Sequence, residues 1–319
     1  MRIALLLALL TVTGCASTLS TMQTAKPLAR GQVRVSGAAG LFVPAGQLGT
    51  LLSQGISEGQ SIKDAILAGQ AYHLAEADAQ RLLGVGLALA VAPPGPSNEL
   101  MLRTGLLASH DLDVGLRLSS TSLRFDGKAR LAHGGDPEDD SLPDYRRKSY
   151  DVALGVGLSR HLFKSPVLDA LEIVQINDFS RWDLEVPVYV SLDVGDIFKL
   201  YGAPKYIYSR TSLDSRLVDF SRGGQDVTGF ELGLPARVSS HFVGASVGVA
   251  LGFRYVHLYA EFTGGYSACR PVLFGQERDL GGVTLYPAVG LAFQNPTPWG
   301  ARSRSRPSST VPENPGNTL

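Results

Sequence analysis

Residues 243–253 have the sequence Val243-Gly244-Ala245-Ser246-Val247-Gly248-Val249-Ala250-Leu251-Gly252-Phe253, with a larger apolar residue at every second position. Successive side chains of a β-strand point to opposite faces, so this period of two predicts a strand with one apolar face and one face of small or polar residues. The same alternation occurs in residues 112–118, 152–158, 186–194 and 285–293. The longer of these segments run nine to eleven residues, near the length a tilted strand needs to cross a membrane.

The composition of the second face distinguishes a membrane barrel from a soluble β-sandwich. A sandwich buries its large aliphatic residues and exposes its charges. Here the second face carries glycine, alanine and serine with occasional charges, as at Glu261 beside Phe262. Aromatic residues gather near strand ends, for example at Tyr206 and Tyr208. Small polar linings and aromatic girdles are typical of transmembrane barrels.

We therefore predict an all-β fold, an antiparallel transmembrane β-barrel of about 12 strands, within a range of 10–14. The longest loops follow odd-numbered strands, as expected for a barrel with both termini in the periplasm. The expected strands are 31–43, 84–92, 99–108, 111–119, 122–132, 149–160, 168–177, 185–194, 199–209, 239–252, 254–265 and 282–294.

Two segments resemble known features of bacterial outer-membrane barrels. Residues 100–116, with Gly105-Leu106 before a polar turn, resemble a hairpin common in these barrels. The strand that ends at Phe293 resembles the aromatic-ended signal read by the barrel assembly machinery, although here a tail follows it. The resemblance implies the outer membrane of a Gram-negative bacterium, with its lipids and the assembly machinery as partners.

The N-terminus has the features of an export signal. Arg2 precedes a short apolar run and small residues that end at Cys15, too short for a spanning helix. Val12-Thr13-Gly14-Cys15 resembles the bacterial lipobox, which implies a covalent lipid on Cys15 and contact with the lipoprotein sorting machinery. Several acyl chains would anchor the chain stably. The alternative is cleavage by a different peptidase beyond Cys15.

The predicted organisation is a signal peptide at 1–14, a lipidated N-terminal linker at 15–30, a barrel at 31–294 and a disordered tail at 295–319. Residues 54–83 interrupt the strand pattern and are rich in alanine, glutamine and leucine, with Ser61 and Asp64 spaced like a helix cap. They predict a helical insertion of about twenty residues. It lies either on an outer loop, which we favour, or inside the barrel as a plug.

Composition excludes several classes of protein. The 319 residues carry no net charge, so no nucleic-acid-binding surface is expected. Beyond Cys15 the only cysteine is Cys269, so no internal disulfide is expected in the mature chain. The acidic run at 136–140 lacks calcium-loop spacing, and we expect neither a metal site nor a cofactor other than the lipid.

The sequence gives little support for catalysis. Ser240 and His241 are adjacent, but neighbours on a strand point to opposite faces and cannot form a nucleophile–base pair. His257 lies on an alternating strand and is interpreted as structural. The spacing Gly-Xaa-Ser-Xaa-Gly occurs at 55–59 and 244–248, but the second match lies inside an alternating strand and not at the strand-to-helix turn of a nucleophile elbow, and no His-Glu-Xaa-Xaa-His motif is present. We therefore expect no enzymatic activity, with a barrel hydrolase as the less favoured reading.

The sequence thus predicts a non-enzymatic outer-membrane lipoprotein barrel that serves as a small passive pore or a structural envelope component. A barrel of ten to twelve strands can be nearly filled by its own side chains. The alternative is a soluble periplasmic β-domain lipoprotein that binds a lipid, glycan or protein partner. Permeant, protein partner, oligomeric state and an open pore are left undetermined. Alternation assigns these charged residues to the lumen: Asp113, Arg117, Asp151, Glu185, Asp193 and Glu261.

Overall fold

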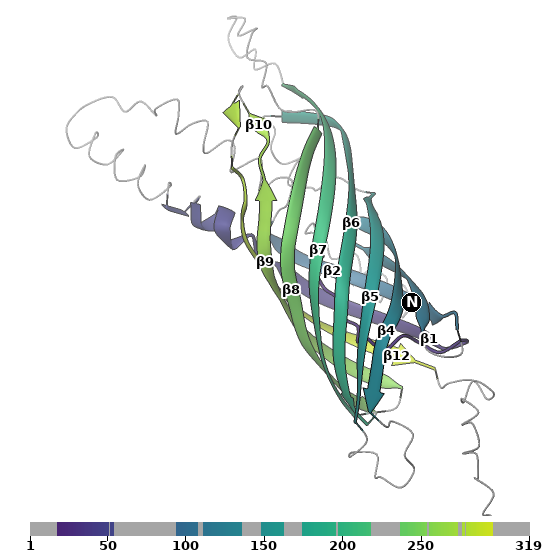
Figure 1. The fold of residues 1–319 in the computed structure, drawn as a ribbon. Helices are drawn as coiled ribbons and strands as arrows, with labels where there is room; N and C mark the ends of the chain where they lie inside the picture. Colours follow the sequence, from purple (N-terminus) through teal and green to yellow (C-terminus); the bar gives the residue numbers. More distant parts are fainter. Residues whose placement is uncertain are drawn as a thin grey trace, which may run out of the picture.

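A computed structural model of the chain shows a closed antiparallel β-barrel (Figure 1). It describes residues 18–50, 52–53, 94–107, 111–135, 148–162, 174–195, 197–217, 237–253, 255–273, 276–277 and 279–295. The strands are β1 (Val33–Phe42), β2 (Gly95–Gly105), β3 (Leu112–Ser119), β4 (Ser122–Gly135), β5 (Lys148–His161), β6 (Val174–Val194), β7 (Phe198–Leu217), β8 (Arg237–Phe253), β9 (Val256–Cys269), β10 (Val272–Leu273), β11 (Gln276–Glu277) and β12 (Gly282–Gln294).

Ten of these strands form the ring, and β10 pairs with β11 in a separate hairpin. Each ring strand pairs with the ring strand that follows it along the chain. The first and last strands, β1 and β12, pair with each other and close the ring, for example at Ala38 and Gly290. Closure leaves no unpaired sheet edge. We call the end where β1 begins and β12 ends the terminal end, and the opposite end the distal end.

The predicted number of about 12 strands is not confirmed, because the described residues form a ring of ten. The strands expected at 168–177 and 185–194 are not separate, since β6 runs from Val174 to Val194. The mixed sequence between them stays in the sheet: Asp183 is paired with Ser159 of β5, and Trp182 lies beside Tyr208 of β7. The strand expected at 84–92 lies outside the described residues.

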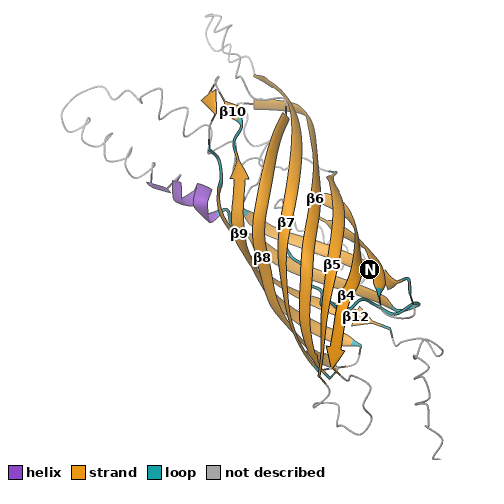
Figure 2. Ribbon diagram, viewed as in Figure 1, coloured by secondary structure: helices purple, strands orange, loops and turns teal. Residues whose placement is uncertain are grey.

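The helical insertion predicted at 54–83 is also not confirmed, because it lies outside the described residues. The described helix is earlier and short, at residues 45–50 and 52–53, and lies outside the ring (Figure 2). Gln47 ties it to the barrel, because its side-chain Nε2 donates to the carbonyl of Leu280 at 3.0 Å.

One expected loop changes sides. The prediction placed the connection after residue 132 on the outer side together with the other long loops. In the ring of ten, β4 ends and β5 begins at the terminal end. At the distal end, β3 and β4 are joined by the two-residue turn 120–121. The ring has one strand fewer before this connection than we predicted, so the connection joins its strands at the opposite end of the barrel.

The two faces of the sheet differ as the alternation requires. On β8 the exposed fractions of Val243, Val247 and Leu251 are 63%, 59% and 52%, whereas Ser246 and Ala250 are fully buried inside the ring. A soluble protein rarely exposes a continuous apolar surface of this kind. At ~3.3 Å per residue and a tilt of ~40°, the stretch from Val243 to Phe253 covers about 25 Å, the height of the apolar band of an outer-membrane barrel.

Aromatic side chains flank this band on both sides. Toward the distal end, Trp182 and Tyr208 make an edge-on contact with ring centroids 5.4 Å apart, and the Tyr206 hydroxyl is 2.6 Å from Nδ1 of His241. Toward the terminal end, Phe253 and Phe293 are 64% and 52% exposed. Amphipathic rings favour the boundary between hydrocarbon and water. The arrangement matches the two girdles of a membrane barrel.

Glycines on the inner face make room for large polar rings. The ring of Tyr201 lies directly over Gly248, and that of Tyr286 lies over Gly40, in positions that a Cβ atom would occupy. Tyr201 and Tyr286 are 2% and 1% exposed. Glycine at these sites therefore lets tyrosines fold flat against the inner wall, which explains part of the high glycine content.

Candidate functional site

The lumen is occupied by the chain's own N-terminal segment. We call residues 18–30 the plug segment. Every residue from Leu19 to Ala29 is buried except Lys26, which is half-buried. The segment enters at the terminal end, where Arg30 donates its backbone N–H to the carbonyl of Leu107 at 2.9 Å. It reaches well into the barrel, where Thr263 of β9 donates to the carbonyl of Leu19 at 3.3 Å.

Basic side chains of the wall bind the carbonyl groups of the plug segment. Lys128 Nζ donates to the Thr24 carbonyl at 2.6 Å, and Arg117 donates to the carbonyls of Ser20 and Thr21 at 2.6 and 3.1 Å. Lys205 Nζ donates to the Leu19 carbonyl. A buried backbone carbonyl needs a donor, and charged donors form the stronger bonds. These three cations supply the hydrogen-bond donors that a neighbouring strand would otherwise offer to the carbonyl groups.

Acidic and hydroxyl side chains bind the N–H groups. Glu261 accepts from the backbone N–H groups of Thr21 and Met22, both at 2.6 Å, and Asp113 accepts from that of Leu28 at 3.0 Å. Met22 has a positive φ of 45°, and successive N–H groups in such a turn converge on one anion. The plug segment is therefore bent at Met22 around the Glu261 carboxylate.

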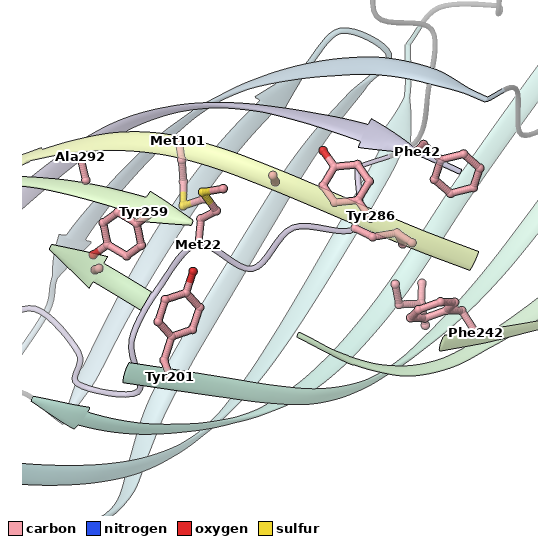
Figure 3. Close-up of a cluster of buried hydrophobic side chains, with 12 residues drawn as sticks. Met22, Phe42, Met101, Tyr201, Phe242, Tyr259, Tyr286 and Ala292 are labelled. Carbon is pink, nitrogen blue, oxygen red and sulfur yellow. The ribbon is translucent and has the colours of Figure 1, made fainter. Parts of the chain in front are cut away.

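The side chain of Met22 fits an apolar pocket in the otherwise polar lumen. It lies with Met101, Tyr201 and Tyr259, from three different strands, in a buried cluster (Figure 3). Met22 is 3% exposed, and a Cβ atom on Gly290 would lie 2.7 Å from its sulfur. Thioether sulfur adapts to irregular gaps and packs well against aromatic rings. The contact anchors the bend that Glu261 holds.

Buried ion pairs line the wall from β2 to β6. Arg103 of β2 donates to Asp113 at 2.5 Å and also to Asp126, with all three side chains at most 2% exposed. Arg124 pairs with Glu185 on β6. Gly115 leaves space for the guanidinium of Arg103, because a Cβ there would lie 2.7 Å from Nη1. These pairs cross-link β2 to β6 through the interior.

All six predicted lumen residues lie inside the barrel, with exposed fractions of at most 5%. Three of them, Asp113, Arg117 and Glu261, bind the plug segment directly. The other three bind neighbours in the wall. The remaining contacts are Glu185 with Arg124, Asp193 with Lys199 at 2.7 Å, and Asp151 with His133 at 2.9 Å and Arg130 at 3.6 Å.

Sequence reasoning missed seven of the thirteen buried Asp, Glu, Lys and Arg residues in the described part of the chain, and the plug segment itself. The signal for the charges is present in Arg124-Phe125-Asp126-Gly127-Lys128, where every second residue is charged. The plug segment gives no such signal, because its small polar residues without periodicity are also typical of the linker predicted at 15–30. The missed wall residues are Arg34, Glu99, Arg103, Arg124, Asp126, Lys128 and Lys205.

A histidine–aspartate pair near the distal end, His161 with Asp183, is the second candidate site. His161 Nε2 lies 3.2 Å from Asp183, and Ser159 donates to the same carboxylate at 3.4 Å. Arg181 also binds Asp183, at 2.8 Å. A hydrolytic triad requires the serine hydroxyl to donate to the histidine. Here one carboxylate binds both side chains, an arrangement that serves the packing of the rim.

No helix in the described ranges has both the length and the apolar character to cross a membrane. Within the same ranges, no three His, Cys, Asp or Glu side chains are grouped to hold a metal ion. The signal at 1–14, Cys15 and the tail beyond Asn295 lie outside the described residues.

Comparison with known proteins finds likenesses among solved structures. No family model and no curated protein matches the chain. Among solved structures, the chain is similar to the crystal structure of Neisserial surface protein A (NspA), with a TM-score of 0.30 and 11% identity. The likeness covers 82% of this chain and 95% of that chain. The description of the fold rests on the closed ring of strands itself.

The bend at Met22 leads to a testable prediction. Replacing Glu261 by Gln removes a charged acceptor from two backbone N–H groups, which costs about 1.5–3 kcal/mol. In a background with Cys15 and Cys269 replaced by Ser, we expect a Thr24→Cys reporter to react with a membrane-impermeant maleimide about tenfold faster in E261Q. Glu277→Gln on β11, outside the ring, is the control. Equal rates in E261Q and the control would show that Glu261 does not hold the plug segment.

Proposed function

We propose that this chain is a non-enzymatic outer-membrane β-barrel of a Gram-negative bacterium whose small pore is held closed by its own plug segment. The observation that carries this proposal is the combination of an apolar outer band with a charged lumen that is already occupied. A closed ring satisfies every backbone group in lipid, and its polar interior sets what passes. With residues 19–29 in place, the barrel acts as a sealed envelope component at rest.

The alternative of a soluble periplasmic β-domain has less support. Such a domain packs its large apolar faces against each other and turns its charges outward. In this barrel the order is reversed: Val243 and Phe262 are 63% and 51% exposed, whereas Asp151 and Arg103 are at most 1% exposed. This inverted distribution favours a lipid surround.

The lipid anchor on Cys15 remains part of the proposal. The mature chain would then be held by its acyl chains and by the barrel, and both the lipoprotein sorting machinery and the barrel assembly machinery would handle it. Export and sorting would bring the protein to the outer membrane, with surrounding lipid as its main partner. No cofactor other than this lipid is proposed.

Expression in a Gram-negative host tests the proposal. We expect recovery in the outer-membrane fraction, slower gel migration after boiling than before, and low conductance of the purified wild type in planar bilayers. Incorporation of labelled palmitate that Cys15→Ser abolishes would support the anchor. Recovery with alkali-extractable proteins and no change in migration would rule out the membrane barrel and return attention to a soluble domain.

A further inference from the structure

The contacts in the lumen are directed mainly to the backbone of the plug segment. Wall side chains bind backbone N–H or carbonyl groups of these residues: Leu19, Ser20, Thr21, Met22, Thr24, Ala25, Lys26 and Leu28. Bonds to plug side chains are fewer, with Ser20 bound by Glu99, Thr21 by Ser246 at 3.0 Å and Gln23 by Tyr189 at 2.7 Å. Every peptide carries the groups on which most of this recognition depends.

The wall residues that make these contacts are themselves held in place. Glu261 accepts from the Tyr201 hydroxyl at 2.9 Å, Lys128 lies 3.6 Å from Asp113, and Arg117 lies 3.3 Å from Glu99. The site is therefore organised by the barrel and does not depend on the plug segment for its geometry. A preorganised site loses little entropy when it binds a ligand.

From this geometry we infer that the lumen is a binding channel for a polypeptide segment without regular secondary structure, and that it accepts such a segment from a separate molecule. This inference rests on the proposed function, because it treats the plug segment as the occupant bound at rest. The ligand class is a peptide that can turn two successive backbone N–H groups toward Glu261 and that has a small residue at the position of Ala25.

The requirement for a small residue follows from packing. Ala25 is fully buried against Ala153, Ala203 and Tyr189, a cluster made of three alanines and one ring. A larger side chain there would need to displace strands β5 to β7, and overpacking of this kind costs about 1–3 kcal/mol or more. The channel thus combines broad recognition of backbone with a size limit at one position.

A peptide in solution competes poorly with a tethered segment, since a short tether gives an effective concentration in the millimolar range. The experiment therefore uses the barrel lacking residues 18–29, purified in detergent. The probe is a fluorescent peptide with the sequence of residues 18–30, blocked at both ends. Its fluorescence anisotropy reports binding, whether or not the barrel conducts.

We expect saturable binding of this peptide and at least tenfold weaker binding after N-methylation at Met22, which removes one N–H from Glu261. Replacing Ala25 of the peptide by Trp should weaken binding similarly, whereas Gln23→Ala should change it less than about fivefold, the effect of one neutral hydrogen bond. Absence of binding, or equal affinity of the N-methylated peptide, would overturn the inference.

The same samples in planar bilayers separate this inference from the proposed function. If the truncated barrel conducts and the peptide reduces the current, both are supported. If it conducts and no peptide binds, the channel inference fails and the closed pore stands. If the peptide binds but the truncated barrel does not conduct, the peptide channel stands and the pore fails.

Discussion

Deletion of residues 18–29 is expected to raise the single-channel conductance of the barrel by about an order of magnitude or more, because it empties a lumen lined by solvated charges. In the complete chain these residues lie buried inside the ring, where Arg117, Lys128 and Glu261 bind them. Once the segment is gone, these charges are free to bind water and ions. The measurement is a current recording of both proteins in planar bilayers at matched salt.

The control removes a stretch of equal length from the other end of the chain. Deletion of residues 302–313, in the tail that composition predicts to be disordered, should leave the conductance at the wild-type level. Both truncated proteins should keep the heat-dependent shift on gels, which shows that the ring is intact. A deletion of 18–29 that keeps this shift and still does not conduct would contradict the closed pore.

The ring was predictable from the sequence because its physical cause is local. Strand alternation needs only one sheet with lipid on one face and polar groups on the other, and Val243 to Phe253 show this directly. The same rule placed Asp113 and Glu261 inside. The rule also covers Lys128, although the charges at every second position of its strand come without a long apolar run on the other face.

The interior arrangement was not predictable because it depends on contacts between residues far apart in sequence. Glu261 binds Thr21, 240 positions away, and nothing in either neighbourhood specifies the other. The count of about 12 strands is not confirmed, although ten lies within the predicted range, for a related reason. The polar sequence around Arg181 and Asp183 is typical of a loop, and only its pairing with β5 and β7 makes it the middle of β6.

Replacing Arg103 by Met is expected to lower the free energy of unfolding of the barrel by about 3–5 kcal/mol, the usual cost of removing one partner from a buried ion pair. Arg103 is 1% exposed and binds Asp113 and Asp126 at once. Its loss leaves two carboxylates close together in the wall, with Lys128 as a cation beside Asp113 at 3.6 Å. Urea titration in lipid vesicles, followed by tryptophan fluorescence, measures the change.

Two further variants decide whether the ion pairs cause this loss. Arg270→Met removes an arginine that is 68% exposed and lies 3.8 Å from Asp279, so its cost should stay below about 1 kcal/mol. Adding Asp126→Asn to Arg103→Met removes one of the two carboxylates that Arg103 bound, the one that keeps only Arg124 at 3.9 Å, and should recover about 1–3 kcal/mol, as expected for residues in direct contact. If the double variant is no more stable than Arg103→Met alone, the loss comes from packing of the long side chain, and the buried charges contribute little to holding the wall together.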